Sequence, residues 1–228
     1  LREHIGNVRV SPSGEYYLTS LVGVAAASRT AAPPVVAVRF DADELIGVDD
    51  RARLAEAEAI LRRRVLRDLM QSGVTIVDPE RTVVELDVRV APDVRIEPGS
   101  ILRGSSSVGA GSVIGPYTVL EDTQVGEDAL IVHSWLTGAT VGNGVHIGPY
   151  SHLRPGTVVQ DDVHIGNYVE AKAATIGAGT RVGHFSYLGD ATLGVGVNVG
   201  AGTITCNYDG ERKHRTIIGD GVFLGSDT

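Results

Sequence analysis

Cationic and titratable side chains in the C-terminal half of the chain are the residues best suited to chemistry. Arg154 and Lys172 stand 18 residues apart, and a guanidinium and an ammonium together suit a phosphate group. His184 follows, and a histidine with a pKa of about 6.5 can take a proton from an amine near neutral pH. Singly, these residues are also what a hydrated surface presents, since exposed charges usually do little. The elements that position them therefore decide between the two interpretations.

Aliphatic residues recur every six positions through this part of the chain, often followed directly by glycine. The series contains Val90, Ile96, Leu102, Val108, Ile114, Leu120, then after a shift of phase Val125, Ile131, Leu136, Val141, Ile147, Leu153, Val159, Ile165, and later Ile176, Val182, Leu188, Leu193, Val199, Ile218 and Leu224. A period of six fits neither an amphipathic helix nor an alternating strand. It is typical of a parallel β-helix, a repeat architecture in which short strands stack coil upon coil.

Three short strands would form one triangular coil of about 18 residues, with the periodic aliphatic side chains pointing into the prism. Residues 18 apart, such as Arg154 and Lys172, would then face the same side on successive coils. The 29 glycines would occupy corners, where positive φ angles cost other residues more. The 11 aromatic residues would be excluded from so narrow an interior. Residues 90–228 leave room for roughly seven coils.

One segment, from Cys206 to Thr216, has no six-residue phase, so it should leave the prism as an exposed loop. It could be a tolerated insertion, but its density of Asn, Tyr, Asp, Lys and Arg makes a binding role at least as plausible. Cys206 is the only cysteine, which excludes an intrachain disulfide and a cysteine-rich zinc site.

The first 50 residues indicate mixed α/β structure. We expect a helix over Glu15–Ser28, a break at Pro33–Pro34 and a buried strand over Val35–Phe40. Fifty such residues cannot close a sheet alone, and the chain opens at Leu1 without a methionine. This segment is therefore expected to be the end of a larger α/β domain, and the chain to be a piece of a longer protein.

Residues 51–72 are expected to form one linker helix, with Asp50 as its N-cap and Gly73 as its C-cap. An apolar stripe at helical spacing would pack one side of this helix against its neighbour. The stripe consists of Leu54, Leu61, Val65 and Leu69.

The overall composition excludes several classes of partner. The net charge of −8, from 20 basic and 28 acidic residues, gives no attraction to nucleic acid or to an anionic membrane. The longest nearly apolar run, Leu18–Ala27, is too short to span a bilayer, and no signal peptide pattern is present. With a single thiol, these features predict a cytoplasmic protein.

Two runs carry a resemblance to a known family, Gly183-His-Phe-Ser-Tyr-Leu-Gly-Asp190 and Val197-Asn-Val-Gly-Ala-Gly-Thr-Ile-Thr-Cys-Asn-Tyr-Asp-Gly210. With Leu153-Arg-Pro-Gly156 and Gly225-Ser-Asp-Thr228 they resemble the bacterial bifunctional enzymes that join a UDP-N-acetylglucosamine pyrophosphorylase to a glucosamine-1-phosphate N-acetyltransferase. Gly14-Glu-Tyr-Tyr-Leu-Thr19 and Gly47-Val-Asp-Asp-Arg51 resemble the end of the pyrophosphorylase domain.

The resemblance implies a mainly β chain built on a left-handed parallel β-helix that assembles as a homotrimer. It divides the chain into a pyrophosphorylase remnant (1–50), a linker helix (51–72) and an acetyltransferase β-helix (73–228) truncated at its C-terminus. The implied reaction is acetyl transfer from acetyl-CoA to glucosamine 1-phosphate. In the intact protein, uridylyl transfer from UTP would then give UDP-N-acetylglucosamine.

The resemblance also implies roles for individual residues, with His184 as the general base that deprotonates the sugar amine. The other implied contacts are to the sugar phosphate (Arg154 and Lys172), to the sugar (Tyr187 and Asn198) and to acetyl-CoA (Ala201, Asn207, Tyr208 and Ser226). Lys213, in the loop, matches a basic residue that the family places near the site. From the residues alone, His184 could be a hydrated corner residue, the tyrosines could be packing residues, and Asn198 could belong to a turn or an internal amide stack.

At one position the chain departs from the family's pattern. The family's pyrophosphorylase half uses an asparagine as a magnesium ligand where this chain has Asp49. An aspartate is a good Mg²⁺ ligand, but one alone cannot hold a functional ion. We therefore predict no pyrophosphorylase activity from these residues. Because the last coils of the family are missing, we also predict weak or no acetyltransferase activity from the chain alone.

Three alternatives stay open at the level of sequence. The chain could belong to a different sugar-1-phosphate nucleotidyltransferase with a β-helix tail, or its β-helix could serve only to trimerise an upstream domain. His146 and His164 should stack on one edge, as in β-helix trimers that bind zinc. A third histidine in register is not evident, because His133 and His152 fall at other phases.

Overall fold

A computed structural model describes residues 5–27 and 35–228 and divides the chain into two compact units, Leu1–Arg53 and Leu54–Thr228. The first unit contains the 3-10 helix η1 (Ile5–Asn7), the helix α1 (Ser20–Ala26) and the 3-10 helix η2 (Ala42–Glu44). The second unit contains most of a long helix and all the strands. The domain boundaries predicted at residues 50 and 72 stay predictions.

The predicted helix over Glu15–Ser28 is too long, because α1 begins only at Ser20. A turn occupies the residues before it: the Ser11 N–H donates to the Glu15 carbonyl (2.8 Å), and the Glu15 N–H donates to Ser11 Oγ (3.1 Å). These bonds hold Glu15 outside a helix. Ser28 and the predicted break at Pro33–Pro34 lie outside the described residues.

The predicted buried strand over Val35–Phe40 is wrong. These residues have no strand assignment, and Val36, Val38 and Phe40 are each more than 60% exposed. A strand needs a neighbouring strand to pair its backbone and a layer to cover its apolar face. The described residues of the first unit provide no other strand.

The long helix α2 (Arg51–Gln71) agrees with the predicted linker helix and with both predicted caps. The Arg53 N–H donates to Asp50 Oδ1 at 2.7 Å. At the other end Gly73 has a φ of +102°, and the Val74 N–H donates to the Leu69 carbonyl. Within the described parts of the chain, no helix is both long and apolar enough to cross a lipid bilayer.

The apolar stripe predicted for this helix is only partly correct. Val65 and Leu69 pack against the core, but Leu54 and Leu61 are about half exposed, at 53% and 48%. The fully buried side chains are Ile60 and Leu66. Helical spacing alone does not fix the width or centre of the buried face, and here Ile60 and Leu66 are buried beside Val65 and Leu69.

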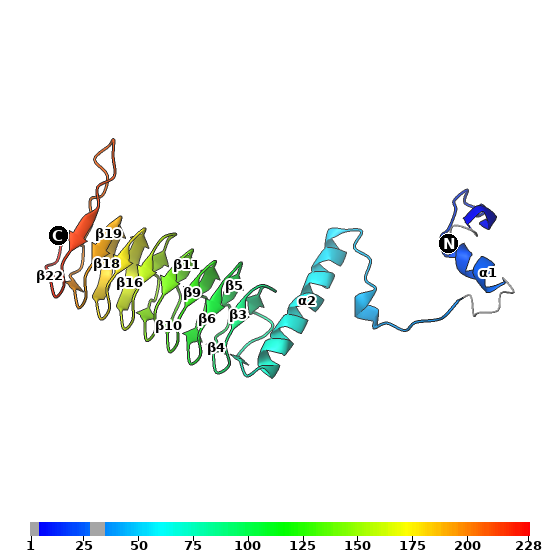
Figure 1. The fold of residues 1–228 in the computed structure, drawn as a ribbon, viewed down its shortest axis with the longest axis horizontal. Helices are drawn as coiled ribbons and strands as arrows, with labels where there is room; N and C mark the ends of the chain where they lie inside the picture. The colour runs from blue at the N-terminus through cyan, green and yellow to red at the C-terminus, as the bar shows by residue number, and fades with distance from the viewer. Residues whose placement is uncertain (1–4, 28–34) are drawn as a thin grey trace. The chain divides into compact units, whose positions relative to one another are not determined.

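All strands pair in parallel and stack as the coils of a parallel β-helix with three faces (Figure 1). The first face contains β1 (Thr75–Ile76), β4 (Arg95–Ile96), β7 (Val113–Ile114), β10 (Leu130–Ile131), β13 (His146–Ile147), β20 (Asn198–Val199) and β22 (Phe223–Leu224). The second contains β2 (Val83–Val84), β5 (Ile101–Arg103), β8 (Val119–Glu121), β11 (Trp135–Thr137) and β14 (His152–Leu153). The third contains β3 (Arg89–Val90), β6 (Ser107–Val108), β9 (Gln124–Val125), β12 (Thr140–Val141), β15 (Val158–Val159), β17 (Thr175–Ile176), β19 (Ala191–Leu193) and β21 (Thr216–Ile218).

Two longer strands, β16 (His164–Lys172) and β18 (Arg181–Gly189), run through the corner from the first face to the second. The eight strands of the third face agree with the roughly seven coils expected for residues 90–228. This architecture is the predicted parallel β-helix, and it is consistent with the left-handed form that the resemblance implies.

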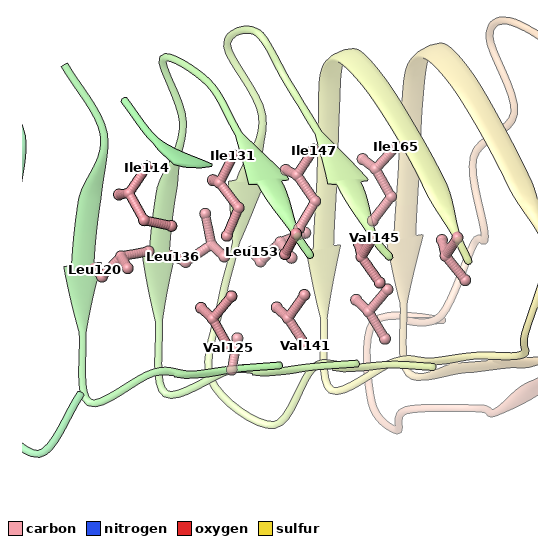
Figure 2. Close-up of a cluster of buried hydrophobic side chains, with 14 of the residues drawn as sticks. Ile114, Leu120, Val125, Ile131, Leu136, Val141, Val145, Ile147, Leu153 and Ile165 are labelled. Atoms are coloured by element: carbon pink, nitrogen blue, oxygen red, sulfur yellow. The ribbon is translucent and has the colours of Figure 1, made fainter. Parts of the chain in front are cut away.

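The interior of the prism is a set of aliphatic rows, as the six-residue period predicts. Figure 2 shows Ile114, Ile131, Ile147 and Ile165 in one row, with the leucines Leu120, Leu136 and Leu153 in a second, and all seven side chains have an exposure of 0%. Among the described residues no phenylalanine, tyrosine or tryptophan is buried in this core. The prediction that aromatic residues are excluded from the interior is therefore confirmed.

The predicted reason for the glycines is confirmed at 15 of the 29, which have a positive φ, and wrong at others. Gly109 and Gly200 do not have a positive φ; instead, a Cβ on either would lie 2.6 Å from the backbone of the next coil. Close stacking of coils, not backbone conformation, requires these glycines. Residues other than glycine also adopt the left-handed conformation, notably six aspartates and five residues with aromatic rings. They are Asp93, Asp122, Asp128, Asp162, Asp190, Asp227, Tyr117, His133, Tyr150, Tyr168 and Phe185.

The segment without the six-residue phase leaves the prism, as predicted. Residues 206–215 form a hairpin that projects from the coils between β20 and β21 (Figure 1). Thr205, just before it, is still buried, whereas Cys206 is exposed.

Candidate functional site

The candidate general base lies where β18 turns from the first face to the second. His184 is exposed and pairs in register with Asn167 of the preceding coil. The Gly202 N–H donates to the Phe185 carbonyl and the Asp227 N–H donates to the Ala201 carbonyl, at 2.9 and 2.7 Å. Ala201 and Ser226 therefore occupy the same corner as His184 on the next two coils.

The two predicted phosphate contacts lie at the far end of the second face, on successive coils. The Arg154 N–H donates to the Ala171 carbonyl at 2.8 Å, which places Arg154 beside Lys172. Arg154 Nη1 also donates to Glu170 Oε1 at 2.8 Å, and both side chains are about two-fifths exposed. The spacing of 18 residues thus predicted their common side correctly.

The projecting hairpin brings a third cation to this place. The pKa of Lys172 is lowered, first by the charge and hydrogen bonding of Lys213 and then by Arg154, while Asp190 opposes the shift. Lys213 Nζ lies 3.9 Å from Asp190 Oδ2. The three cations form what we call the cation row: Arg154, Lys172 and Lys213.

Tyr187 lies between the corner and the cation row, on the second face. It is half-buried, pairs in register with Glu170, and its ring covers Gly189, where a Cβ would collide with it. Gly189 itself pairs with Lys172. Tyr187 therefore connects the position of His184 with that of the cation row along a single strand.

The hairpin is ordered around one aspartate. Asp209 Oδ1 accepts the N–H groups of Glu211 and Arg212 at 2.8 and 2.7 Å, and its Oδ2 lies 2.6 Å from His214 Nε2. The bonds from the Arg212 N–H, from His214 and from the Glu211 N–H lower the pKa of Asp209 to about 2. Tyr208 pairs with Lys213 across the hairpin, and its hydroxyl donates to the Gly210 carbonyl at 2.6 Å.

At the base of the hairpin, Asn207 Nδ2 donates to Asp190 Oδ2. Of the four predicted acetyl-CoA contacts, Ala201 and Ser226 therefore lie at the corner of His184. The other two, Asn207 and Tyr208, lie in the hairpin beside the cation row.

Two predicted site residues lie elsewhere. Asn198 is in β20 on the first face, in register with Arg181 and Phe223, so this chain does not place it with the cation row on the second face. Asp49 is exposed in the first unit. In residues 5–27 and 35–228 no three His, Cys, Asp or Glu side chains gather as a metal site, so Mg²⁺ binding by Asp49 stays a prediction.

His146 and His164 stack in register as predicted, with ring centroids 4.9 Å apart. Burial, His146 and Arg181 lower the pKa of His164. His133 belongs to a different corner row, between Tyr117 and Tyr150. The phase difference predicted for His133 is thereby confirmed.

Two residues beside the site were missed by the sequence reasoning. Glu170 pairs with Arg154, and Asp190 contacts both Asn207 and Lys213. A signal for Asp190 was available, because it continues the step of 18 residues from Arg154 to Lys172. The signal for Glu170 was weaker, because its partner stands 16 residues away.

Comparison with known proteins extends this picture. Residues 138–171 match the family model described as bacterial transferase hexapeptide (six repeats). A protein of Trichlorobacter lovleyi is 48% identical over 229 residues, covering 100% of this chain and 49% of the relative, and it is named bifunctional protein GlmU. Homology to GlmU therefore extends over the whole chain. GlmU proteins of Alkalilimnicola ehrlichii and Streptococcus suis are 51% and 44% identical, each match covering 94% of this chain and 46% of the relative.

The chain spans about half the length of the GlmU relatives that it matches. Solved structures are more distant. A Francisella novicida UDP-N-acetylglucosamine acyltransferase is 13% identical. The match covers 66% of this chain and 62% of that chain, with a TM-score of 0.34. A Caulobacter crescentus GDP-perosamine N-acetyltransferase is 16% identical, with coverages of 72% and 60% and a TM-score of 0.30. Matches with scores this low carry no weight for the site.

Proposed function

We propose that the intact protein transfers the acetyl group of acetyl-CoA to the amine of glucosamine 1-phosphate, giving N-acetylglucosamine 1-phosphate. The observation that carries this proposal is the cation row, which adjoins the C-terminal end of β18, the strand that contains His184. Homology to GlmU supports it. A cationic phosphate site and a histidine base joined by one strand are what a phosphorylated amino sugar needs.

The sugar amine attacks in its neutral form, and His184 takes the proton that the nitrogen loses as its new bond forms. The amine nitrogen bonds to the thioester carbonyl carbon, and the C–S bond then breaks to release coenzyme A as the thiolate. The proton held by His184 can pass to that sulfur. An imidazole can both accept and donate a proton near neutral pH, which suits both transfers.

A backbone amide at the glycine-rich corner is suited to the negative oxygen that develops during attack. In the described part of the chain, the Gly200 and Gly202 amides already donate to the Leu224 and Phe185 carbonyls. The Ala201 amide, between them and beside His184, is left for the oxyanion. Its position agrees with the acetyl-CoA contact that the resemblance implies for Ala201.

The remaining roles are proposed as the resemblance implies them, with Lys213 added to the phosphate contacts because it lies beside Lys172. The cation row binds the phosphate, Tyr187 contacts the sugar, and Asn207, Tyr208 and Ser226 contact acetyl-CoA. Asn198 lies on another face of this chain, so its sugar contact would be made in the homotrimer, to a sugar bound at a neighbouring copy. The intact protein would work in the cytoplasm and couple this step to Mg²⁺-dependent uridylyl transfer from UTP.

The decisive experiment compares His184→Ala with His146→Asn in the full-length protein, measuring release of the coenzyme A thiol. Loss of a general base costs about 10²–10⁴-fold in turnover. His146 is a control because it is a histidine on the first face, stacked on His164 and away from the second face. Unchanged turnover in His184→Ala, with the assembly intact, would refute the base assignment. Transfer to other amino sugar phosphates but not to glucosamine 1-phosphate would refute the substrate.

A further inference from the structure

Asp190 is the acidic residue that contacts the hairpin and adjoins the cation row. Its side chain is 22% exposed, accepts the bond from Asn207 Nδ2 and lies 3.9 Å from Lys213 Nζ. Both partners belong to the hairpin, whereas Asp190 belongs to the prism. One carboxylate therefore joins the two parts of the site.

The backbone fixes the direction of this carboxylate. Asp190 has a φ of +47°, a conformation that aspartate tolerates better than most residues. Its N–H donates to the Lys172 carbonyl at 3.0 Å, and its carbonyl accepts the Thr216 N–H at 3.2 Å. Asp190 is thus bonded to the coil below and to the C-terminal end of the hairpin.

The charges explain why a carboxylate is needed there. Lys213 and Lys172 repel each other, which is the main cause of the lowered pKa of Lys172. Another cross-link from the hairpin to the prism has a neutral acceptor: Arg215 Nε donates to Thr192 Oγ1 at 2.9 Å. Without Asp190, repulsion between the two ammonium groups would move the hairpin away from the cation row.

We propose that Asp190 is a positioning residue that holds Lys213 and Asn207 beside Lys172 and so assembles the phosphate-binding site. An ammonium has three donors, so a contact with Asp190 leaves Lys213 others for a phosphate oxygen. The identity of the ligand rests on the function proposed above. The positioning of the hairpin does not.

The direction in which KM changes when Asp190 is removed distinguishes a positioning role from a purely electrostatic one. If Asp190 were only a negative charge near the phosphate, its removal would strengthen binding of a phosphate dianion. If Asp190 positions Lys213, its removal weakens binding. The two hypotheses predict opposite changes in KM.

The test uses Asp190→Asn in the full-length protein, with Asp122→Asn as the matched control. Asp122 has nearly the same φ, +48°, but its carboxylate accepts bonds from Ser105, away from the hairpin. We expect Asp190→Asn to raise the KM for glucosamine 1-phosphate about tenfold, with kcat changed less than about twofold. Asp190→Glu should restore part of the affinity, and Asp122→Asn should change neither constant. An unchanged or lowered KM in Asp190→Asn would overturn the proposal.

A second readout needs no catalysis. Hydrogen exchange of residues 206–216 and chemical labelling of Lys213, both followed by mass spectrometry, should become faster in Asp190→Asn and not in Asp122→Asn. If the full-length protein lacks the proposed activity but the hairpin loosens, the function fails and the positioning role stands. If Asp190→Asn does not fold, Lys213→Gln in the same exchange assay replaces it. Unchanged exchange in the variant measured would overturn the positioning role.

Discussion

The early coils and the late coils of the prism share one core but differ at their edges. Leu136 and Leu188 are both fully buried in equivalent rows. In contrast, the early strands contain two or three residues, whereas β16 and β18 each contain nine and run through a corner. Lys172, His184 and Tyr187 lie on these long strands, so the repeat provides the scaffold and departures from it position these three side chains.

Two aspartates at corresponding corners show the difference in detail. Asp122 accepts bonds from the Ser105 N–H and Oγ, at 2.9 and 3.1 Å, which ties it to its neighbouring coil. Asp190 has the same backbone conformation, but its carboxylate contacts the hairpin through Asn207 and Lys213. An aspartate at this corner can therefore either bond to the neighbouring coil, as Asp122 does, or hold the hairpin, as Asp190 does.

The largest expected effect tests whether the core is really the same in both regions. Leu136→Ala and Leu188→Ala each remove a side chain with 0% exposure. Each should lower the free energy of unfolding by about 2–5 kcal/mol, through lost burial and the cavity left behind. Denaturant unfolding of the full-length protein measures both. A loss at Leu188 much smaller than at Leu136 would show that the late coils are packed less tightly.

Matched ion pairs should separate scaffold from site. Arg103 pairs with Glu121 at 2.9 Å and Arg154 pairs with Glu170 at 2.8 Å, with similar exposure. Methionine at either arginine should cost at most about 1 kcal/mol of stability, because both pairs are partly exposed. Only Arg154→Met should raise the KM for glucosamine 1-phosphate, by about tenfold. Equal kinetic effects at the two positions would remove Arg154 from the phosphate site.

Sequence reasoning worked where one period governs many residues. The period of six predicted the buried rows and the loop, and the step of 18 placed Arg154 beside Lys172. It failed at Val35–Phe40, where a strand depends on neighbours that the pattern does not contain. It also failed at glycines such as Gly109 and Gly200, where contact between coils decides and φ is not positive. It missed Asp190 because the role of that residue depends on where the hairpin folds back.

A smaller effect concerns pH. Lys213 and Arg154 lower the pKa of Lys172, so Lys172 loses its proton below the ordinary lysine pKa of 10.5. A bound phosphate dianion would raise that pKa again, so binding takes up a proton. Affinity should therefore fall as pH rises through the lowered pKa, and calorimetric titration with glucosamine 1-phosphate at several alkaline pH values measures this. Lys172→Arg should abolish the decline, because a guanidinium stays charged.

The smallest expected effect tests whether the hairpin is a folded part of the site. Three bonds lower the pKa of Asp209 from 3.8 to about 2. A lowered pKa in the folded state means that the ionised carboxylate stabilises the hairpin fully above pH 3.8, and that this contribution is lost as pH falls through about 2. Exchange of the Glu211 and Arg212 amides, corrected for intrinsic rates, should therefore stay protected down to about pH 3 and lose protection below it. In Asp209→Ala the same amides should be unprotected at every pH, while the amides of β18 keep their protection, because the prism does not depend on the hairpin turn.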